Sequence, residues 1–219
     1  MKENALIIFL KYPKVGEVKT RLAAVLGNAQ THQLYKCFLT DIAVMTHKVN
    51  AQILIAYSGP ANASFADFPG VPSIRQRGSD IGERMFFAFE EVLTQGFERV
   101  ALIGSDAPDL PASMINDAFE ILRSVDIVLG PSTDGGYYLA ACKRGSLRQS
   151  MFSDIPWSTG RVFSETLQRI DDAGLASAEL QPWSDIDDFD DLKNFYMRNR
   201  QSSSKVVQYL DSVKFLRET

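Results

Sequence analysis

The sequence predicts an α/β fold, a three-layer sandwich in which helices cover both faces of a mostly parallel sheet. Four short runs are almost continuously apolar, as strands buried on both faces are. Segments with helical periodicity separate them and supply the crossover connections that parallel strands require. The chain has 219 residues, of which 45% are hydrophobic and 23% charged, which suits one sizeable core. We therefore expect a single domain over residues 1–219.

The elements follow each other along the chain in a βα alternation. The expected strands are residues 5–10, 52–57, 99–104 and 126–130, and the expected helices between them are residues 30–47, 81–95 and 111–123. A shorter helix is expected to begin near Lys19 and Arg21. Beyond residue 131 the alternation loosens, and the pattern predicts a strand over 136–142 and helices over 159–173, 188–199 and 205–217.

Composition excludes several classes of protein. The net charge of −4 argues against a general nucleic-acid-binding surface, which would need a basic field. The apolar run at 5–10 is too short for a secretion signal, and no run approaches the ~20 apolar residues that span a bilayer. Cys37 and Cys142 stand in apolar stretches without the spacing of a metal or redox motif. We expect buried thiols in a cytoplasmic protein.

Ligands of open α/β sheets bind outside the carboxyl ends of the strands, so the residues after each apolar run are candidates for a site. After the first run come Lys11, Lys19 and Arg21. Cations at a helix start oppose the helix dipole, so a phosphate ligand is a better reason for them than helix stability. The alternative is a solvated basic loop, and the glycine framework of a P-loop is missing.

Carboxylates follow the later strands. Asp106 comes directly after the run at 99–104 and could hold Mg²⁺, whereas Asp109 is better explained as a turn former or helix cap. Asp134 precedes a Gly-Gly pair, which is also a common tight turn. Asp185 and Asp187 alternate ahead of a helix and should face the same side, although an acidic run is usually a solvated face.

Residues 75–84 join a loop to a helix and mix glycines with arginines. Backbone and amide groups there could hold a base and ribose, and the alternative is an ordinary helix start capped by Ser79 or Asp80. His32 and His47 have no plausible partner, and we assign them no role.

Five segments together resemble one family, the bacterial glycosyltransferase A (GT-A) or nucleotide-diphospho-sugar transferase-like group. They are Lys11…Lys19-Thr-Arg-Leu22, Gln76-x-Gly78…Gly82-x-Arg84-Met85, Gly104-Ser-Asp-x-Pro108, Pro131…Asp134-Gly-Gly-Tyr137 and Asp185-Ile-Asp187…Asp191-Leu192. The first segment also looks like 2-phospho-L-lactate guanylyltransferase and, more distantly, molybdenum-cofactor guanylyltransferase. The chain departs from the family in carrying Asp188-Phe189 in place of Thr-Pro, and its acidic motif is Asp-x-Pro.

The resemblance implies a nucleotide-diphospho-sugar transferase (GT-A, Rossmann-like) fold and a site that uses Mg²⁺ or Mn²⁺. Asp106 would be the first metal ligand, with Asp134 or the pair Asp185 and Asp187 as the second. Lys11, Lys19 and Arg21 would hold phosphates. The nucleotide-binding residues implied are Gln76, Gly78, Gly82, Arg84 and Ser105.

The leading hypothesis is nucleotidyl transfer from an NTP to a small phosphorylated or acidic acceptor, because three clustered cations exceed what a diphosphate needs. Glycosyl transfer from a nucleotide-diphospho-sugar is the first alternative, and a non-catalytic nucleotide-binding protein is the second. The acceptor should lie near residues 137–183, where Tyr137 and Trp157 could contact it or pack in the core.

Overall fold

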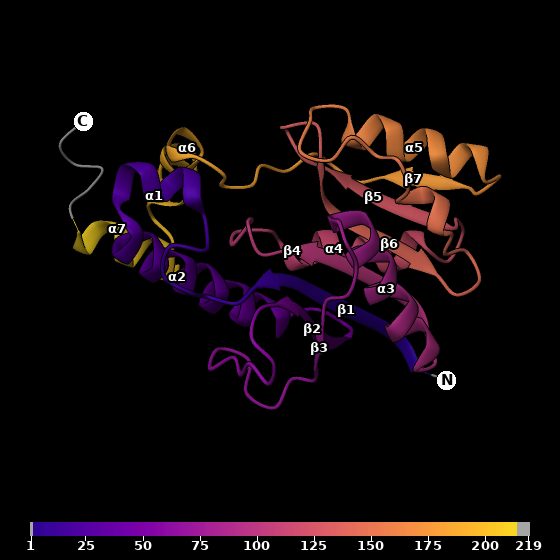
Figure 1. Ribbon diagram of the computed structural model, residues 1–219, viewed down its shortest axis with the longest axis horizontal. Coiled ribbons are helices and arrows are strands. Elements are labelled where there is room, and N and C mark those ends of the chain that lie inside the picture. The colour runs from indigo at the N-terminus through magenta and orange to yellow at the C-terminus, as the bar shows by residue number, and fades with distance from the viewer. Residues whose placement is uncertain (1, 214–219) are drawn as a thin grey trace.

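A computed structural model describes residues 2–213 of the chain, and its fold is the predicted sandwich (Figure 1). The elements in order are β1 (Lys2–Lys11), α1 (Thr20–Leu26), α2 (Asn28–Thr46), β2 (Gln52–Ser58), β3 (Ser73–Arg75), α3 (Ile81–Thr94), β4 (Phe97–Gly104), α4 (Ala112–Ile121), β5 (Ile127–Pro131), β6 (Tyr137–Lys143), a 3₁₀ turn η1 (Gln149–Met151), α5 (Val162–Asp172), β7 (Ser177–Glu179), α6 (Phe189–Asn199) and α7 (Lys205–Ser212).

The sheet is mostly parallel, with the strand order β3-β2-β1-β4-β6-β5-β7. β1 pairs in parallel with both β2 and β4, whereas β6 runs antiparallel between β4 and β5. A tight turn joins β5 to β6, and at Gly135 (φ +88°) an added Cβ would stand 2.3 Å from the carbonyl oxygen of Gly160. Because β6 runs opposite to β1 and β4, its first residue, Tyr137, lies at the edge of the sheet where β1 and β4 end.

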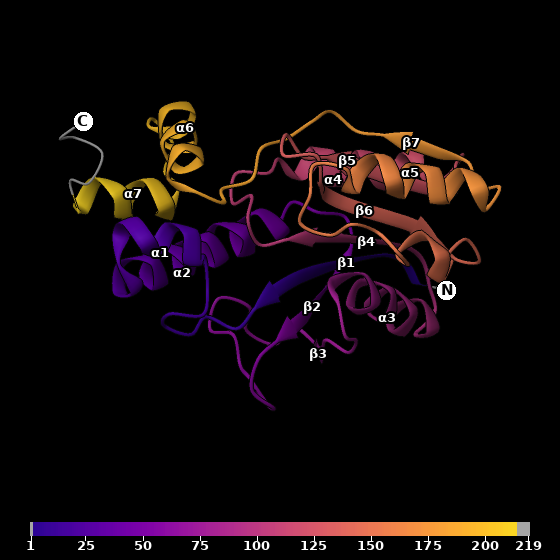
Figure 2. The same cartoon turned by 45° about the horizontal axis from the view of Figure 1, so that its top comes forward.

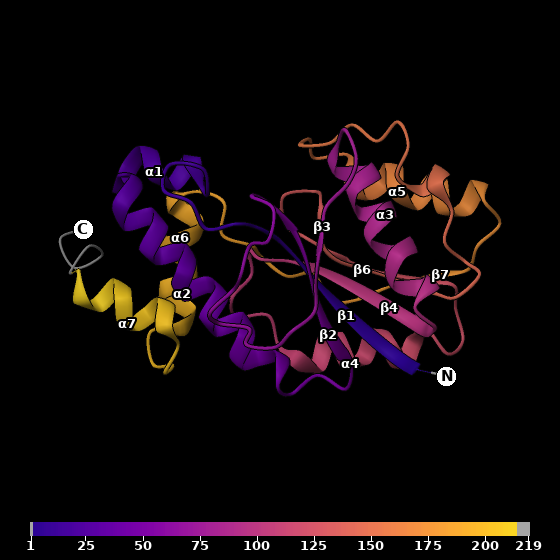
Figure 3. The same cartoon turned by 60° about the horizontal axis from the view of Figure 1, so that its bottom comes forward.

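Helices cover both faces of the sheet because the side chains of each buried strand alternate. In β1, Leu6 and Ile8 pack with the helix layer of α2 and α4, whereas Ala5 and Ile7 pack with that of α3 and α5. Figure 3 shows α3 and α5 on one side of the sheet and α4 on the other. The core therefore consists of two apolar layers, one on each face.

The helices α1, α2, α6 and α7 gather beyond one end of the sheet (Figures 1 and 2). Two segments from opposite ends of the chain thus meet. One is α1 with its preceding loop, and the other is α6 with residues 185–188 before it, the acidic segment. This meeting brings residues near position 19 beside residues near position 187.

Several details differ from the sequence-based expectation. Gly27 (φ +79°) separates α1 from α2, which begins two residues before the expected position 30. The edge strands β3 and β7 were not predicted, since three largely exposed residues show no apolar run. Residues 214–217 of the last predicted helix lie outside the described residues. Cys142 is buried as predicted, but Cys37 is only half-buried.

Within residues 2–213, the search for a helix long and apolar enough to cross a membrane found none.

Candidate functional site

An open cleft of about 410 Å³, the main cleft, lies at the carboxyl ends of β1, β2 and β4. It brings together eight of the predicted site residues: Lys11, Lys19, Arg21, Gln76, Arg84, Ser105, Asp106 and Asp187. They come from four of the five segments that carry the family resemblance. The rule that ligands bind beyond the ends of parallel strands thus locates the cleft correctly.

Lys19 lies at the centre of this arrangement. Its ammonium Nζ is 2.8 Å from Oδ1 of Asp106 and 2.8 Å from Oδ1 of Asp187, and only 7% of its side chain is exposed. The residue precedes α1 with left-handed backbone angles, φ 45° and ψ 51°. Non-glycine residues adopt this conformation rarely, so the fold holds the lysine there. The cation predicted to hold phosphate is therefore paired with two carboxylates predicted to hold metal.

The ion pairs also set the charge of these groups. Burial by itself lowers the pKa of Lys19, but the carboxylates of Asp106 and Asp187 outweigh burial and raise it. Burial by itself raises the pKa of Asp187, but Lys19 and Arg21 outweigh it and lower that pKa. Lys19 and Asp187 are consequently both charged at neutral pH. Arg21 is 3.7 Å from Asp187, with 71% of its side chain exposed and able to turn toward a ligand.

Tyr35 is a buried residue of the cleft that the sequence did not mark. Its hydroxyl donates to the carbonyl oxygen of Lys11 at 3.0 Å and lies 2.9 Å from Oγ of Ser105. The ring thereby ties the end of β1 to the end of β4. Burial is the main reason why the pKa of Tyr35 is raised. Its place on the apolar face of α2 is an ordinary core position, so no local pattern could have revealed this role.

The segment predicted to hold the base is only partly in the cleft. Gln76 lines it, and its Nε2 donates to the carbonyl oxygens of Leu10 and Ala56 at 3.2 and 3.0 Å. Arg84 also lines it, with Nε donating to the carbonyl oxygen of Gly78 at 3.1 Å. Asp80, as one of the two predicted caps, accepts a hydrogen bond from the backbone of α3.

The two glycines of this segment, Gly78 and Gly82, lie outside the lining of the main cleft. A Cβ on Gly82 would stand 2.5 Å from the carbonyl oxygen of Phe152 and 2.7 Å from the Trp157 ring. Gly78 has φ +128°, and an added Cβ would be 2.7 Å from Cβ of Glu83. Close packing is the reason for both glycines.

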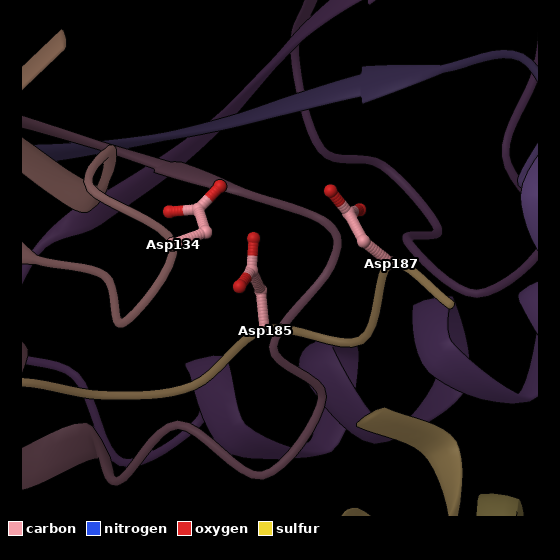
Figure 4. Close-up of side chains that lie close together, drawn as sticks. All are labelled: Asp134, Asp185 and Asp187. Carbon is pink, nitrogen blue, oxygen red and sulfur yellow. The ribbon is translucent and has the colours of Figure 1, made fainter. Parts of the chain in front are cut away.

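A second group of carboxylates, the acidic cluster, consists of Asp134, Asp185 and Asp187 (Figure 4). One oxygen of each lies within 4.8 Å of the others. Asp185 and Asp187 face the same side, as predicted. Between them Ile186 is fully buried, and its N–H donates to the carbonyl oxygen of Asp106 at 2.8 Å. This bond fastens the acidic segment to the loop after β4.

The acidic cluster is electrostatically strained without a cation. Burial, aided by repulsion from Asp187 and Asp134, raises the pKa of Asp185 to about 6, against the opposing hydrogen bond from Ser132 at 2.9 Å. Carboxylate oxygens that repel one another are the ligands that Mg²⁺ and Mn²⁺ prefer. The donor set formed by Asp106 and the acidic cluster therefore fits the predicted hard divalent cation.

A side pocket of about 180 Å³ adjoins the main cleft and shares Phe9, Ile81 and Asp106 with it. Its other lining residues are Met85, Leu102, Gly104, Ala107, Leu110, Tyr137, Tyr138 and Asp185. Tyr137 thus lines a pocket beside the cleft. Trp157 does not line it but packs against Gly82 and, at 6.5 Å between ring centroids, against Tyr137. Of the two aromatic residues considered for the acceptor, Trp157 is a packing residue.

Asp109 lies in the turn that the sequence favoured for it, which the N–H of Leu110 closes by donating to the carbonyl oxygen of Ala107 at 3.1 Å, and its carboxylate has further partners. It accepts hydrogen bonds from Nε of Arg198 at 2.7 Å, from Nδ2 of Asn199 at 2.6 Å and from Nε1 of Trp183 at 3.2 Å. These contacts anchor both ends of the stretch that contains the acidic segment and α6. Asp109 therefore positions Asp187 from a distance.

The comparisons with known proteins agree with this architecture. Residues 41–159 match the family described as an uncharacterized protein conserved in bacteria (DUF2064). A candidate nucleotide-diphospho-sugar transferase from Desulfovibrio desulfuricans G20 has a similar crystal structure, with 34% identity and a TM-score of 0.91. The match covers 99% of this chain and 97% of that one. A search of curated proteins found no match.

More distant structures share the fold. A CMP:2-keto-3-deoxy-manno-octonic acid synthetase complexed with CTP has 12% identity and a TM-score of 0.59, covering 91% of this chain and 99% of that one. Rv0371c of Mycobacterium tuberculosis H37Rv, in complex with manganese, has 15% identity and a TM-score of 0.53, covering 92% and 100%. This chain therefore belongs to the bacterial DUF2064 family and has the fold of nucleotide-diphospho-sugar transferases.

Proposed function

We propose that the protein is a metal-dependent transferase that uses a nucleotide donor, and that it transfers a nucleotidyl group from an NTP. The observation that carries the proposal is the main cleft, where cations and carboxylates converge beyond the ends of β1, β2 and β4. Its cations are Lys11, Lys19, Arg21 and Arg84. A CTP complex and a manganese complex among proteins of the same fold support a nucleotide and a metal.

The chain's own residues would act by binding and positioning. Lys11 and Arg21, both exposed at the cleft, would contact the phosphates through charge-assisted hydrogen bonds. Asp106 and Asp187 would hold the cation, with Asp185 or Asp134 beside them. A bound Mg²⁺ or Mn²⁺ would neutralise charge on the phosphates during transfer. Gln76 and Arg84, on the α3 side of the cleft, would lie near the base and ribose.

The reaction needs no covalent bond to the protein. An acceptor hydroxyl would attack the α-phosphorus of the NTP and release its proton to solvent. A new P–O bond would form, and the bond to the β-phosphate would break with pyrophosphate as leaving group. In such transfers, positioning and charge stabilisation supply most of the rate enhancement. The fixed cations and carboxylates of the cleft are suited to both tasks.

The acceptor would occupy the side pocket, which opens beside Asp106. The lining residues given above are mainly apolar and include two carboxylates, Asp106 and Asp185, and no cation. A phosphorylated or acidic acceptor, as expected from the sequence, would meet like charge there. The pocket favours an acceptor with an uncharged body and a free hydroxyl group.

Glycosyl transfer remains the alternative because the side pocket could equally receive the sugar of a nucleotide-diphospho-sugar, and the similar protein from D. desulfuricans is named for such donors. The four cations of the main cleft favour the triphosphate. A non-catalytic binding protein is less favoured, because the cleft keeps both its cations and its carboxylates.

The test offers each class of donor to the purified protein with Mg²⁺ or Mn²⁺ and a panel of uncharged hydroxyl acceptors. Metal-dependent pyrophosphate release from an NTP would support nucleotidyl transfer. Release of a nucleoside diphosphate from a UDP-, GDP-, dTDP- or ADP-sugar would replace it with glycosyl transfer. Tight binding of a nucleotide without turnover of any donor would leave the non-catalytic alternative.

A further inference from the structure

We propose that the divalent cation is not resident in the free protein but enters together with the donor's phosphates, because Lys19 holds the cation's carboxylates until phosphate arrives. This inference rests on the proposed function and specifies it: the substrate is a metal–polyphosphate complex. Lys19 then has two alternating partners, the carboxylates in the free protein and the phosphates in the complex.

The first step of the argument is competition for the same atoms. The ammonium of Lys19 contacts Oδ1 of Asp106 and Oδ1 of Asp187 at 2.8 Å each, so these oxygens already have a cationic partner. A divalent cation bound by the same pair would stand beside a buried ammonium that cannot escape into water, since 7% of the side chain is exposed. Lys19 in its present position therefore competes with a cation for these two carboxylates.

The second step concerns the backbone. Lys19 keeps left-handed angles that glycine adopts readily and lysine does not. Such a conformation persists only where the surroundings hold it, and the two ion pairs at 2.8 Å are contacts that hold this residue. The lysine is thus placed at the carboxylates by the fold, and its position is not one chance rotamer among many.

The third step is charge balance. The two carboxylates of Asp106 and Asp187 are offset by Lys19 and by Arg21, which lies 3.7 Å from Asp187. A free divalent cation would add two positive charges beside these two carboxylates, which Lys19 and Arg21 already offset. A polyphosphate brings at least three negative charges and gives Lys19 a new partner, as Lys11 and Arg84 line the same cleft. Cation and polyphosphate should consequently bind with strong positive cooperativity.

The acidic cluster provides an internal check. Its members Asp134 and Asp185 are not the carboxylates that Lys19 contacts. If a free cation binds tightly through them, then removing Lys19 will change little and Asp185→Asn will weaken binding. If Lys19 instead keeps the cation from the carboxylates, then removing Lys19 will raise the affinity for the cation, and this increase will require Asp106.

The experiment measures Mn²⁺ binding by electron paramagnetic resonance, without nucleotide, for the wild type, Lys19→Met, Lys19→Gln and the control Lys36→Met. Lys36 is an exposed lysine of α2 outside the cleft. We expect both Lys19 variants to bind Mn²⁺ at least tenfold more tightly than the wild type and the control. Adding Asp106→Asn to Lys19→Met should abolish the gain.

A second measurement uses the wild type alone, so that it does not depend on the folding of a variant. Thermal unfolding is followed with Mn²⁺, with inorganic tripolyphosphate, and with both. We expect the combined shift in melting temperature to exceed the sum of the separate shifts. Tight Mn²⁺ binding to the free wild type, additive shifts, or equal Mn²⁺ affinity with and without Lys19 would each overturn the inference.

These outcomes are separable from failure of the proposed function. Tripolyphosphate carries no base, sugar or transferable nucleotidyl group, so the cooperativity test involves no turnover. A protein that turns over no donor can still show the exchange at Lys19, and an active transferase with a resident cation would fail only this test.

Discussion

At the scale of single residues, the site depends on Asp187, which belongs to two groups at once. It shares Lys19 with Asp106, and it shares the acidic cluster with Asp134 and Asp185. Positive charge lowers its pKa, whereas burial and neighbouring carboxylates raise that of Asp185. Adjacent carboxylates with opposite shifts are typical of functional sites. Substituting single residues of the site should therefore affect ligand binding and stability differently at each position.

Asp106→Asn should lower metal-dependent nucleotide binding or turnover by about 100-fold or more, because a carboxylate that would bind the cation is lost. Folding should change little, by about 1 kcal/mol, since 42% of the side chain is exposed and Lys19 keeps Asp187. Isothermal titration with Mg²⁺ and an NTP, together with urea unfolding, checks both parts. The control is Asp117→Asn on the exposed face of α4. An unchanged metal response would remove Asp106 from the site.

Arg21→Ala should weaken binding of a triphosphate by roughly 1.5–3 kcal/mol, the usual contribution of a charge-assisted hydrogen bond. The side chain is 71% exposed, so the free energy of unfolding should hardly change. The dissociation constant of the NTP in the presence of Mg²⁺ is the quantity to measure. The matched control is Arg123→Ala, which changes an exposed arginine just after the end of α4. If both variants bind the nucleotide as the wild type does, the phosphates lie elsewhere.

Asp185→Asn should stabilise the metal-free protein at pH 7.5 by about 1–2 kcal/mol. A carboxyl group whose pKa is raised to about 6 by folding destabilises the native state once it ionises. The penalty is absent below about pH 4, grows between pH 4 and pH 6, and is complete above pH 6. The full shift would correspond to ~3 kcal/mol, reduced by solvent screening.

Unfolding in urea at several pH values, with EDTA present, tests this pH dependence. The stability difference between Asp185→Asn and the wild type should vanish near pH 4. A constant difference at all pH values would show that the variant acts through packing and not through charge.

At the scale of elements, the acidic segment before α6 is held by contacts at its two sides. Ile186 bonds to the carbonyl oxygen of Asp106, and Asp109 binds Trp183, Arg198 and Asn199. At the start of α6, Asp188 and Asp191 form a capping box. The loop after β4 therefore carries one carboxylate of the site and positions another.

Asp109→Ala should destabilise the fold by about 2–4 kcal/mol, because it leaves the Arg198 guanidinium and two N–H donors without their partner. It should also weaken Mg²⁺-dependent nucleotide binding, since the segment with Asp187 loses its anchor. Denaturant unfolding and nucleotide titration measure the two effects, with the exposed Asp171→Ala as control. Full stability in the variant would mean that these contacts are dispensable.

The sequence predicted the elements whose own residues show a pattern, either an apolar run or helical periodicity. The central strands β1, β2, β4 and β5 read as apolar runs because helices bury both faces. The strands β3 and β7 could not be found, because short edge strands need neither burial nor alternation. The sequence could not distinguish close packing from ligand approach at Gly78 and Gly82, because both require the same residue type.

At the scale of the whole molecule, the site joins residues far apart in the chain. Lys19 and Asp187 are separated by 168 positions. The sequence could place their segments at one edge of the sheet, because the ends of parallel strands share an edge. It could not show that Lys19 pairs with carboxylates, nor that β6 enters between β4 and β5, because both depend on tertiary packing. The role of Tyr35 was hidden for the same reason.

The central claim is that the main cleft binds a nucleotide and a divalent cation together, and thermal unfolding of the wild type and Asp106→Asn tests it most directly. With Mg²⁺ and an NTP at ~100 times its dissociation constant, the wild type should gain about 2.7 kcal/mol of stability, and the variant should gain almost none. Either ligand alone should have a much smaller effect on the wild type. No metal-dependent stabilisation by any NTP or nucleotide-sugar, or equal stabilisation of both proteins, would contradict the claim.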